Sequence, residues 1–492
     1  MKALKTVRII LAAAMLLGIT ALLLDATGVL RHYLGWMPKV QLLPALLAAN
    51  LTIVVVILAL TLLLGRLYCS VICPLGVMQD LVARLNRKHN PYNYSGAMWW
   101  LRITALCVFV LLTVTGLTGI AALIAPYSTY GRIITHLIQP LWIGADNLLA
   151  LGAEAVDSYA VSEADWVFYG WVPLMVTSLT LVIIAVLAYR GGRTWCNTIC
   201  PVGTALGCVS RASLLKVRFN EELCIGCGKC SRNCKAACID FKTYDIDSSR
   251  CIVCGNCIDL CPKGALSYGL AVSNGKKEKK EETVDKSKRQ FLIGTALLAG
   301  TALAQEEKKV DGGLAEIEDK VAPKRQTPLT PPGSLTARNM AEKCTACQLC
   351  VSECPNDVLR PSTLLDHFMQ PTMSYEHGYC RPECVRCSTV CPTGAIRPIT
   401  KQEKSSLQIG HAVWVKQNCV PLTDGVECGN CARHCPTGAI TMVPSDPDDE
   451  WSLKVPVVNT ATCIGCGACE NLCPARPLSA IYVEGHEMHR VI

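Results

Sequence analysis

Cysteine spacing constrains this chain more than any other feature. Of its 31 cysteines, 24 fall into six runs of four, five of them written as C-x2-C-x2-C-x3-C or a near variant. Disulfide-rich secreted proteins are short, and their cysteine spacings are irregular. A [4Fe–4S] cluster instead takes three thiolates from one tight loop and a fourth from elsewhere. The runs therefore predict at least six such clusters.

The first two runs form a compact module at residues 219–271. In bacterial two-cluster ferredoxins the fourth cysteine of each run ligates the other cluster. One cluster is therefore expected on Cys224, Cys227, Cys230 and Cys261, and its neighbour on Cys251, Cys254, Cys257 and Cys234. Gly226, Gly228 and Gly255 are expected to let the backbone wrap the clusters closely. Cys238 is left over, and we expect it to be structural.

Four further runs lie in a second module, residues 334–492. They are Cys344, Cys347, Cys350, Cys354; Cys380, Cys384, Cys387, Cys391; Cys419, Cys428, Cys431, Cys435; and Cys463, Cys466, Cys469, Cys473. A proline follows each fourth cysteine and ends the ligand loop. Zinc suits a single C-x2-C pair, but not three cysteines with a distant fourth. Spacing alone leaves open which of these runs exchange their fourth cysteine.

The apolar residues concentrate in residues 1–218. The whole chain is 51% hydrophobic and only 17% charged. Membrane helices need about 20 apolar residues, and four segments meet this: Val7–Leu24, Leu43–Leu64, Met98–Leu123 and Val167–Ala188. Leu141–Ala155 carries Asp146 and Glu154, and we expect a peripheral segment there. The predicted fold class is a membrane α-helical bundle with two α+β ferredoxin-like domains.

The cations predict the orientation of these spans. Lys2, Lys5, Arg8, Arg66, Arg84, Arg87, Lys88, Arg190, Arg193, Arg211, Lys216 and Arg218 flank the spans on one side, which the positive-inside rule assigns to the cytoplasm. The connection from Ala125 to Trp166 holds one firm cation, Arg132, against Asp146, Glu154, Asp157, Glu163 and Asp165, and is expected outside. This topology explains the net charge of +8 without a nucleic-acid partner. Four buried helices of a soluble core would not show this asymmetry.

One motif in the membrane half occurs twice. Arg66-Leu-Tyr-Cys69-Ser-Val-Ile-Cys73-Pro74-Leu-Gly76 returns as Arg193-Thr-Trp-Cys196-Asn-Thr-Ile-Cys200-Pro201-Val-Gly203. In a helix, each cysteine pair would share one face. We expect Cys69, Cys73, Cys196 and Cys200 to converge at the cytoplasmic surface as a further metal centre; zinc or a redox-active disulfide are the alternatives. Cys107 and Cys208 are expected in the core.

Residues 272–333 are expected to connect the modules. A charged stretch, Asn274–Gln290, precedes the apolar segment Phe291–Ala304, and the Pro-rich Ala322–Gly333 follows. Lys288-Arg289 before this segment resembles a twin-arginine export signal, with lysine in the first position. We expect a fifth, export-derived crossing that places the second module outside. The alternatives are cleavage after Ala304 or a short surface helix with all clusters cytoplasmic.

The second module resembles the four-cluster ferredoxin subunits of respiratory molybdoenzymes. That resemblance implies that the first and last runs exchange ligands, as do the middle two. Cys473 would then complete the site of Cys344, Cys347 and Cys350, and Cys354 that of Cys463, Cys466 and Cys469. Likewise Cys435 would join Cys380, Cys384 and Cys387, and Cys391 would join Cys419, Cys428 and Cys431.

The order of the parts resembles a fusion of two ferredoxin-type proteins. The spans, the doubled motif and the two-cluster module resemble NapH-type quinol dehydrogenase subunits, and the export signal with four clusters resembles their NapG-type partner. This implies a multi-pass protein of the bacterial inner membrane, acting in anaerobic respiration. It would oxidise quinol and reduce a periplasmic oxidoreductase, such as nitrate reductase, or a cytochrome c. The alternative is a non-enzymatic conduit or maturation factor that delivers cytoplasmic electrons to a periplasmic metalloenzyme.

Quinol oxidation needs a proton acceptor near a span end. His32, Arg132, His136, Tyr127 and Trp36 lie near the outer ends of the predicted spans. Each is individually more typical of an interfacial anchor, so these residues are weak candidates for a quinol site. No nucleotide fingerprint or nucleophile motif is present in the sequence, and no catalytic residue is assigned.

Overall fold

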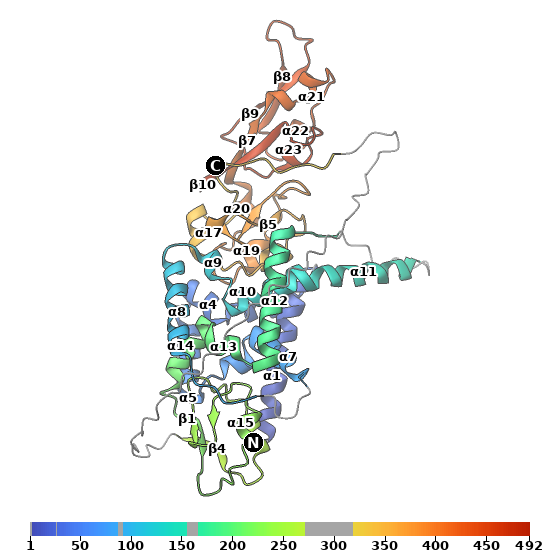
Figure 1. Cartoon of the computed structure of the whole chain (residues 1–492). Helices are drawn as coiled ribbons and strands as arrows, with labels where there is room; N and C mark the ends of the chain where they lie inside the picture. The colour runs from blue at the N-terminus through green and yellow to red at the C-terminus, as the bar shows by residue number, and fades with distance from the viewer. Residues whose placement is uncertain (1, 26, 87–91, 155–165, 271–317) are drawn as a thin grey trace, which may run out of the picture.

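The computed structural model describes residues 2–25, 27–86, 92–154, 166–270 and 318–492. Figure 1 shows an elongated molecule with the two-run module at one end, helices in the middle and the four-run module at the other end. The charged linker and the export-like segment Phe291–Ala304 lie outside the described residues, so the fifth crossing stays a prediction.

Residues 2–210 form the helical bundle. Its elements are α1 (Lys2–Leu24), α2 (Leu30–Leu34), α3 (Trp36–Lys39), α4 (Leu42–Leu47), α5 (Leu51–Leu64), α6 (Tyr68–Val71), α7 (Pro74–Arg84), α8 (Trp99–Val114), α9 (Thr118–Ala121), α10 (Pro126–Ile133), the π-helix η1 (Ile134–Ile138), α11 (Gln139–Glu154), α12 (Trp171–Gly191), α13 (Thr194–Thr198) and α14 (Pro201–Ser210). The internal repeat appears as α5–α6–α7 and α12–α13–α14, with α7 packed on α12 and α14 on α5.

Two helices of the described residues, not four, are long and apolar enough to cross a membrane: Lys5–Leu24 and Trp171–Gly191. The expected second span is broken between α4 and α5, where Ala49 has φ +54° and Asn50 caps α5 by accepting from the Ile53 amide. The third ends at α8, and Gly116 follows with φ +84°. Helices α5 and α8 are therefore only about 21 and 24 Å long.

The predicted peripheral segment is helix α11. In Figure 1 it leaves the bundle sideways, at a steep angle to α1 and α12, instead of running beside them. Leu141, Trp142, Leu148 and Leu149 are exposed on it. The expectation of a segment that is not a span fits this arrangement.

The two-run module contains β1 (Leu215–Phe219), α15 (Lys229–Arg232), β2 (Ile239–Asp240), β3 (Asp245–Ile246), α16 (Asn256–Leu260) and β4 (Leu266–Leu270). β1 pairs antiparallel with β4, from Leu215 opposite Leu270 to Phe219 opposite Leu266. β2 pairs with β3. The module therefore begins at Leu215, four residues before the expected boundary, because its first strand is needed to close it.

The four-run module contains α17 (Ala337–Lys343), α18 (Leu349–Ser352), β5 (Leu359–Pro361), η2 (Leu365–His367), β6 (Pro371–Met373), α19 (Arg386–Val390), α20 (Lys401–Ser405), β7 (Leu407–Trp414), η3 (Lys416–Asn418), α21 (Val420–Thr423), α22 (Asn430–Arg433), β8 (Ile440–Pro444), β9 (Lys454–Val458), α23 (Ala468–Asn471) and β10 (Ile481–Val491). Its ladders are β5–β6, β7–β10 and β8–β9, all antiparallel.

The Pro-rich stretch 322–333 is not a linker, contrary to expectation. Leu329 and Thr330 are buried in the four-run module. Just before, the Arg325 guanidinium pairs with the buried Glu470 carboxylate at 2.5 Å. Proline has no amide hydrogen to satisfy, so an extended Pro-rich segment can be buried against the module without leaving donors unpaired.

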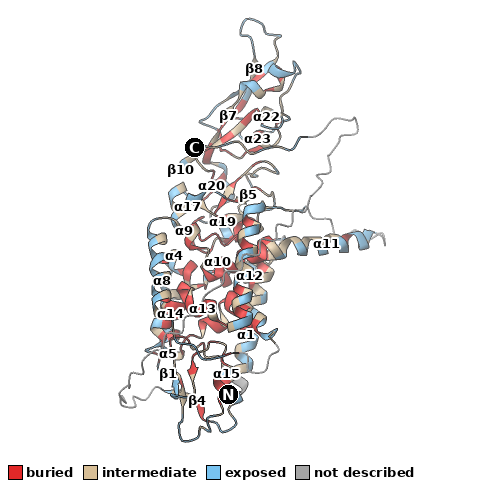
Figure 2. Ribbon diagram, viewed as in Figure 1, coloured by how far each residue is buried: buried red, intermediate tan, exposed pale blue. Residues whose placement is uncertain are grey.

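One apolar core continues from the bundle into the four-run module. It includes Ile19 of α1, Tyr127 of α10, Cys347 and Val483. Figure 2 shows buried residues along the centre of the bundle and exposed residues on its outer faces. At the junction, the Thr118 hydroxyl donates to the Cys344 carbonyl at 3.0 Å. A Cβ on Gly131 would lie 2.2 Å from the Cys347 carbonyl oxygen, so the backbones touch there.

This contact predicts that Gly131→Ala separates α10 from the Cys347 loop. We expect a loss of about 1–3 kcal/mol, typical of overpacking, measured as a lower thermal unfolding midpoint of the detergent-solubilised protein. Gly152→Ala in α11 is the control, because nothing lies within 4 Å of its Cβ position. Equal midpoints for both variants would contradict the junction.

Candidate iron–sulfur centres and the paired thiol site

The loops of the two-run module have the backbone expected around clusters. Gly226, Gly228 and Gly255 have φ of +67°, +64° and +76°. The Gly226 amide donates to the Cys224 sulfur at 3.4 Å, and the Ala265 amide to the Cys261 sulfur at 3.2 Å. Such amides stabilise the negative charge of a thiolate-bound cluster.

Cys234, Cys251, Cys254 and Cys257 line one cavity, as the predicted ligand exchange requires. Burial raises the pKa of Cys254 to about 11, and repulsion from Cys234 adds to the rise. Thiols of this kind lose their protons on binding iron. The Cys238 sulfur is buried 3.5 Å from that of Cys234. Ligation by these residues, and by Cys224, Cys227, Cys230 and Cys261, remains a prediction.

In the four-run module, the first run meets the second. Cys354, Cys380, Cys384 and Cys387 line one cavity. Cys391 lies near the remaining three cysteines of the first run. Burial raises the pKa of Cys347 to about 12, and repulsion from Cys391 adds to it; burial and Cys391 also raise the pKa values of Cys344 and Cys350.

The third run likewise meets the fourth. Cys419, Cys428, Cys431 and Cys473 line one cavity. Burial raises the pKa of Cys466 to about 12, and repulsion from Cys463 and Cys435 adds to the rise. The first and second runs form one half of the module and the third and fourth runs form the other. The two halves are in contact where the Cys380 amide donates to the Cys466 carbonyl at 2.9 Å.

These positions overturn the exchange implied by the molybdoenzyme resemblance. Cys354 belongs with Cys380, and not with Cys463; Cys473 belongs with Cys419, and not with Cys344. The physical reason is that the first and second runs fold together as one half of the module, and the third and fourth runs fold together as the other half. The first half joins the core of the bundle, and Cys419, Cys463 and Cys473 lie in a core of their own.

Lys404 is a site residue that the sequence analysis missed. It is buried, and its Nζ lies 3.1 Å from the Cys380 sulfur and 2.6 Å from the Arg381 carbonyl oxygen. It also donates to the Cys384 carbonyl. No ion pair to Lys404 occurs in the described part of the chain. A buried lysine with no carboxylate partner fits a negatively charged cluster beside it. No spacing signal could have found it.

The doubled motif brings its four thiols together inside the bundle. Cys69, Cys73, Cys196 and Cys200 are all buried, with 3–4% of each exposed; their position on the cytoplasmic side of the membrane stays a prediction. Burial raises the pKa values of the Cys73 and Cys200 thiols. Repulsion from Cys69 and Cys196 adds to the rise at Cys73, and repulsion from all three other cysteines adds to it at Cys200. Within each pair the cysteines do not share a helix face. Pro74 and Pro201 disfavour helix at the residue before them, so Cys73 and Cys200 are extended N-caps of α7 and α14.

The arginines of the two motifs bind reciprocally. Arg66 Nη2 donates to the Cys196 carbonyl at 3.5 Å, and Arg193 Nη1 donates to the Cys69 carbonyl. A Cβ on Gly76 would lie 2.8 Å from Arg193 Nη1, and one on Gly203 would lie 2.9 Å from Arg66 Nη2. The motif glycines therefore leave room for the other repeat's arginine. These two arginines are fully buried, so they do not act as topology signals as expected.

Cationic side chains outnumber anionic ones at this site. Arg193 binds Asp80 through two bonds of 2.9 and 3.0 Å, and Lys235 Nζ lies 3.5 Å from the same carboxylate. Arg66 has no carboxylate partner among the described residues, and its Nη2 lies 3.7 Å from the Cys69 sulfur. Two positive charges thus lack a counterion, which favours thiolates carrying two negative charges over a neutral disulfide.

No group of three or more Cys, His, Asp or Glu side chains in the described residues is arranged to hold a single metal ion. That holds equally for the 24 cysteines of the six runs.

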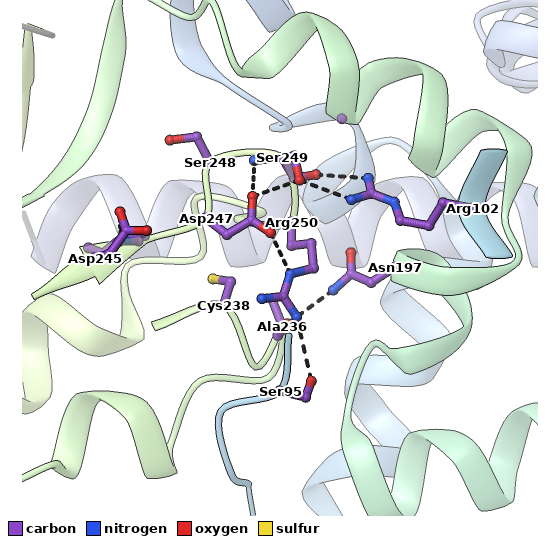
Figure 3. A network of polar contacts seen from close by, with 12 residues as sticks. Ser95, Arg102, Asn197, Ala236, Cys238, Asp245, Asp247, Ser248, Ser249 and Arg250 are labelled. Atoms are coloured by element: carbon purple, nitrogen blue, oxygen red, sulfur yellow. Dashed lines mark hydrogen bonds and ion pairs between the residues drawn. The ribbon is translucent and has the colours of Figure 1, made fainter. Parts of the chain in front are cut away.

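The paired thiol site contacts the two-run module. The Ser249 carbonyl accepts from Arg66 at 2.8 Å. The same carbonyl accepts from Arg102 at 3.3 Å, as Figure 3 shows. Asn197 Nδ2 donates to the Ala236 carbonyl at 3.2 Å. Ser249 precedes Cys251 by two residues, and Ala236 follows Cys234 by two. The loops of one candidate cluster therefore rest on the doubled motif.

Three of the five outer quinol candidates lie together. Tyr127, Arg132 and His136 are buried on α10 and η1, and each has a polar atom without a partner in the described part of the chain. His32 and Trp36 are exposed on α2 and α3. Cys107 and Cys208 are also exposed, contrary to the expectation of core positions.

Native thiol alkylation, mapped by mass spectrometry, tests the run pairing. In Cys354→Ser we expect Cys380, Cys384 and Cys387 to become reactive, because their cluster loses its fourth ligand. Cys107→Ser is the control and should expose no cysteine of the six runs. Reactivity of Cys463, Cys466 and Cys469 instead would restore the first-with-last exchange.

Lys404→Gln tests the charge beside Cys380. We expect the reduction potential of that cluster to fall by some tens of millivolts, because the oxidised, less negative cluster is favoured once the cation is gone. Redox titration followed by electron paramagnetic resonance measures it. Lys401→Gln on the exposed side of α20 should leave the potential unchanged; equal shifts would refute a local effect.

Two family models match the chain. One, described as a 4Fe-4S binding domain, matches residues 46–91 and 172–220, which contain the two copies of the doubled motif. The other, described as a 4Fe-4S dicluster domain, matches residues 223–265, 343–405 and 426–476. Residues 343–405 contain the first and second runs together, in agreement with the geometry.

Several curated proteins are similar in sequence. YccM of Escherichia coli (strain K12), named for a role in electron transport, is 27% identical over 248 residues, covering 48% of this chain and 63% of YccM. The methylamine utilization ferredoxin-type protein MauM of Methylobacillus flagellatus is 28% identical over 215 residues, covering 42% of this chain and 87% of MauM.

The ferredoxin-type protein NapH of Escherichia coli (strain K12) is 27% identical over 245 residues, covering 48% of this chain and 72% of NapH. The chain spans less than two thirds of YccM. Together with the two apolar helices, these relatives indicate a membrane-associated protein. The chain is an iron–sulfur protein with 4Fe-4S domains, similar to the ferredoxin-type proteins NapH, MauM and MauN and to YccM.

Proposed function

We propose that this chain carries electrons from a membrane quinol, through [4Fe–4S] clusters, to an acceptor on the opposite side of the membrane. One observation carries the proposal. The two cysteine-rich modules lie at opposite ends of the helical bundle, and the helices α7, α13 and α14 of the doubled motif lie between them (Figure 1). A protein with all its clusters on one side would not need this separation.

Contacts between neighbouring sites support a serial order. The loop after Cys234 touches the doubled motif, where the Arg193 amide donates to the Lys235 carbonyl at 2.8 Å. Beyond the paired thiols, α10 packs on α7 and reaches the Cys347 loop through Gly131. The Cys380 and Cys466 loops then join the two halves of the four-run module. When bound, [4Fe–4S] clusters supply one-electron transfer along such a series.

The paired thiol site is proposed to hold a seventh cluster. Its two uncompensated positive charges match the double negative charge of an oxidised cubane with four thiolates. A 4Fe-4S model matches both segments. Zinc with four thiolates has the same charge, but no arrangement for a single ion occurs among the described residues.

Helices α5 and α8 are proposed to complete a four-span bundle. Both expose apolar side chains, including Val55 and Val56 on α5 and Trp100 and Leu111 on α8. Local thinning of the bilayer would accommodate their short length. Helix α11, with its exposed leucines and tryptophan, would lie on the membrane surface.

The sidedness follows from charge. Lys5, Arg84 and Arg190 lie near the two-run module, and Lys216 and Arg218 lie in its first strand, so we assign this module to the cytoplasm by the positive-inside rule. The four-run module would then be periplasmic, and the chain would correspond to a NapH-like part joined to a NapG-like part. An acceptor such as a periplasmic nitrate reductase or a cytochrome c would dock at the outer half, and no nucleic-acid partner is proposed.

A second candidate is a conduit for cytoplasmic electrons. Leu223 and Ile225, beside Cys224, are exposed at the end of the two-run module. Such apolar side chains around a cluster loop suit docking of a soluble donor. Reduction by a soluble ferredoxin but not by quinol would favour this candidate.

The test uses the anaerobically purified, detergent-solubilised protein. We expect about 28 iron and 28 sulfide per chain, from seven cubanes, and bleaching of the cluster absorbance by a short-chain quinol. A protein whose clusters are reduced by dithionite but not by the quinol would refute the quinol donor.

Cys200→Ser tests the middle of the series. We expect about four iron fewer per chain, and quinol reduction of only one of the two cysteine-rich modules, the one at the end where quinol binds. Cys208→Ser on the same helix, α14, is the matched control because Cys208 is exposed. Unchanged iron content and full reduction in Cys200→Ser would remove the paired thiols from the relay.

A further inference from the structure

A cavity of about 190 Å³ lies where α1, the end of α5 and the two-run module meet. Its walls are mostly apolar and come from three elements: Leu11 of α1, Leu64 of α5 and Ile258 of α16. Val71 and Val253 are among the other apolar residues that line it. No role described so far uses this space.

Polar groups of opposite charge stand at its rim. The Lys5 Nζ lies 2.7 Å from Asp259 Oδ2, and both side chains are partly exposed, by 30% and 24%. Arg8 also lines the cavity, and its Nε is buried without a partner in the described part of the chain. The rim therefore offers a carboxylate acceptor and cationic donors beside an apolar interior.

One wall belongs to a candidate cluster loop. Cys254 lines the cavity, and Val253 before it has φ +53°. The corresponding residues of three other cluster loops, Gly226, Ala346 and Gly465, also have positive φ. A β-branched residue is an outlier in this region and stores strain. Here the Val253 Cγ2 lies 3.1 Å from the Cβ position of Gly65, so the strained valine closes the wall against the end of α5.

We infer that this cavity binds the head group of the quinol that reduces the protein, an inference that rests on the proposed function. The ligand class is a membrane-soluble dihydroxy-aromatic with an apolar tail. Its ring suits the apolar walls, and its two oxygens suit the rim of Lys5, Arg8 and Asp259. Leu11 and its neighbours Val7 and Ile10 are exposed on α1, so the tail reaches the cavity from lipid without crossing water.

Oxidation at this point balances. Two O–H bonds of the quinol break and a quinone remains. Two electrons leave one at a time to the cluster proposed on Cys234, Cys251, Cys254 and Cys257, which accepts one electron and passes it to the next proposed cluster before it accepts the second. The two protons pass to water at the rim, where the side chains of Lys5 and Asp259 are partly exposed.

A second cavity on α1, of about 250 Å³, is the natural comparison. It is lined by Leu16, Leu17, Asp80 and Leu81 among others, and no cysteine is among its lining residues. Leu17, like Leu11, is an exposed leucine of α1. Substitutions at Leu11 and Leu17 therefore differ in the cavity that they fill, and not in helix or exposure.

The experiment fills each cavity in the full-length, cluster-loaded protein. Leu11→Trp and Ile258→Trp block the proposed site from two elements, and Leu17→Trp is the control. Equilibrium binding of tritiated short-chain benzoquinone and naphthoquinone gives a readout independent of turnover. We expect binding to weaken at least about tenfold in both blocking variants and to change less than about twofold in the control.

The outcomes separate the site from the function. Iron content and dithionite reduction equal to wild type show that each variant is folded and loaded. Wild type reduced by quinol, with binding and reduction lost only in Leu11→Trp and Ile258→Trp, supports the site. Quinol reduction retained in both blocking variants, or lost in Leu17→Trp alone, overturns the site and leaves the proposed function standing. Failure of quinol to bind or reduce wild type overturns both.

Discussion

The reciprocal binding of Arg66 and Arg193 is the contact on which the rest of the structure depends. Each guanidinium is fully buried and donates to the backbone carbonyl of the other repeat's first cysteine. An isolated charge in a dry interior costs many kcal/mol. Asp80 pairs with Arg193 and balances part of this charge. The anionic centre proposed on the four thiols would balance the rest.

The same arginines also position the two-run module against the bundle. Arg66 extends past the thiols to the Ser249 carbonyl, which Arg102 also binds. On the opposite side Gly131 of α10 lies against Cys347, and Gly119 of α9 lies against Phe368. A bundle of rigid short helices thus holds one cluster loop against each end. Electron transfer between sites falls steeply with distance, so this close docking matters more for the proposed function than any single cluster.

The pairing of the runs in the four-run module differs from the pairing that the resemblance to molybdoenzyme subunits implied. A run of cysteines specifies three ligands because they lie within one loop. The fourth ligand depends on which loops meet, and that is decided by packing. Here cysteine runs that are adjacent in sequence pair to form two halves, and the Cys380–Cys466 backbone contact joins these halves. The exchange taken from the molybdoenzyme subunits does not fit this packing, although the same 24 cysteines are involved.

The sequence by itself determined the parts that are local. Cysteine spacing identified the candidate cluster loops, and the repeat identified four thiols that converge, because both depend on a few adjacent residues. Tertiary structure decided the rest. It buried Lys404 beside Cys380, turned Arg66 and Arg193 from apparent topology signals into site residues, and broke two expected spans at Ala49 and Gly116. Long-range packing sets burial and charge environment, and no local pattern records it.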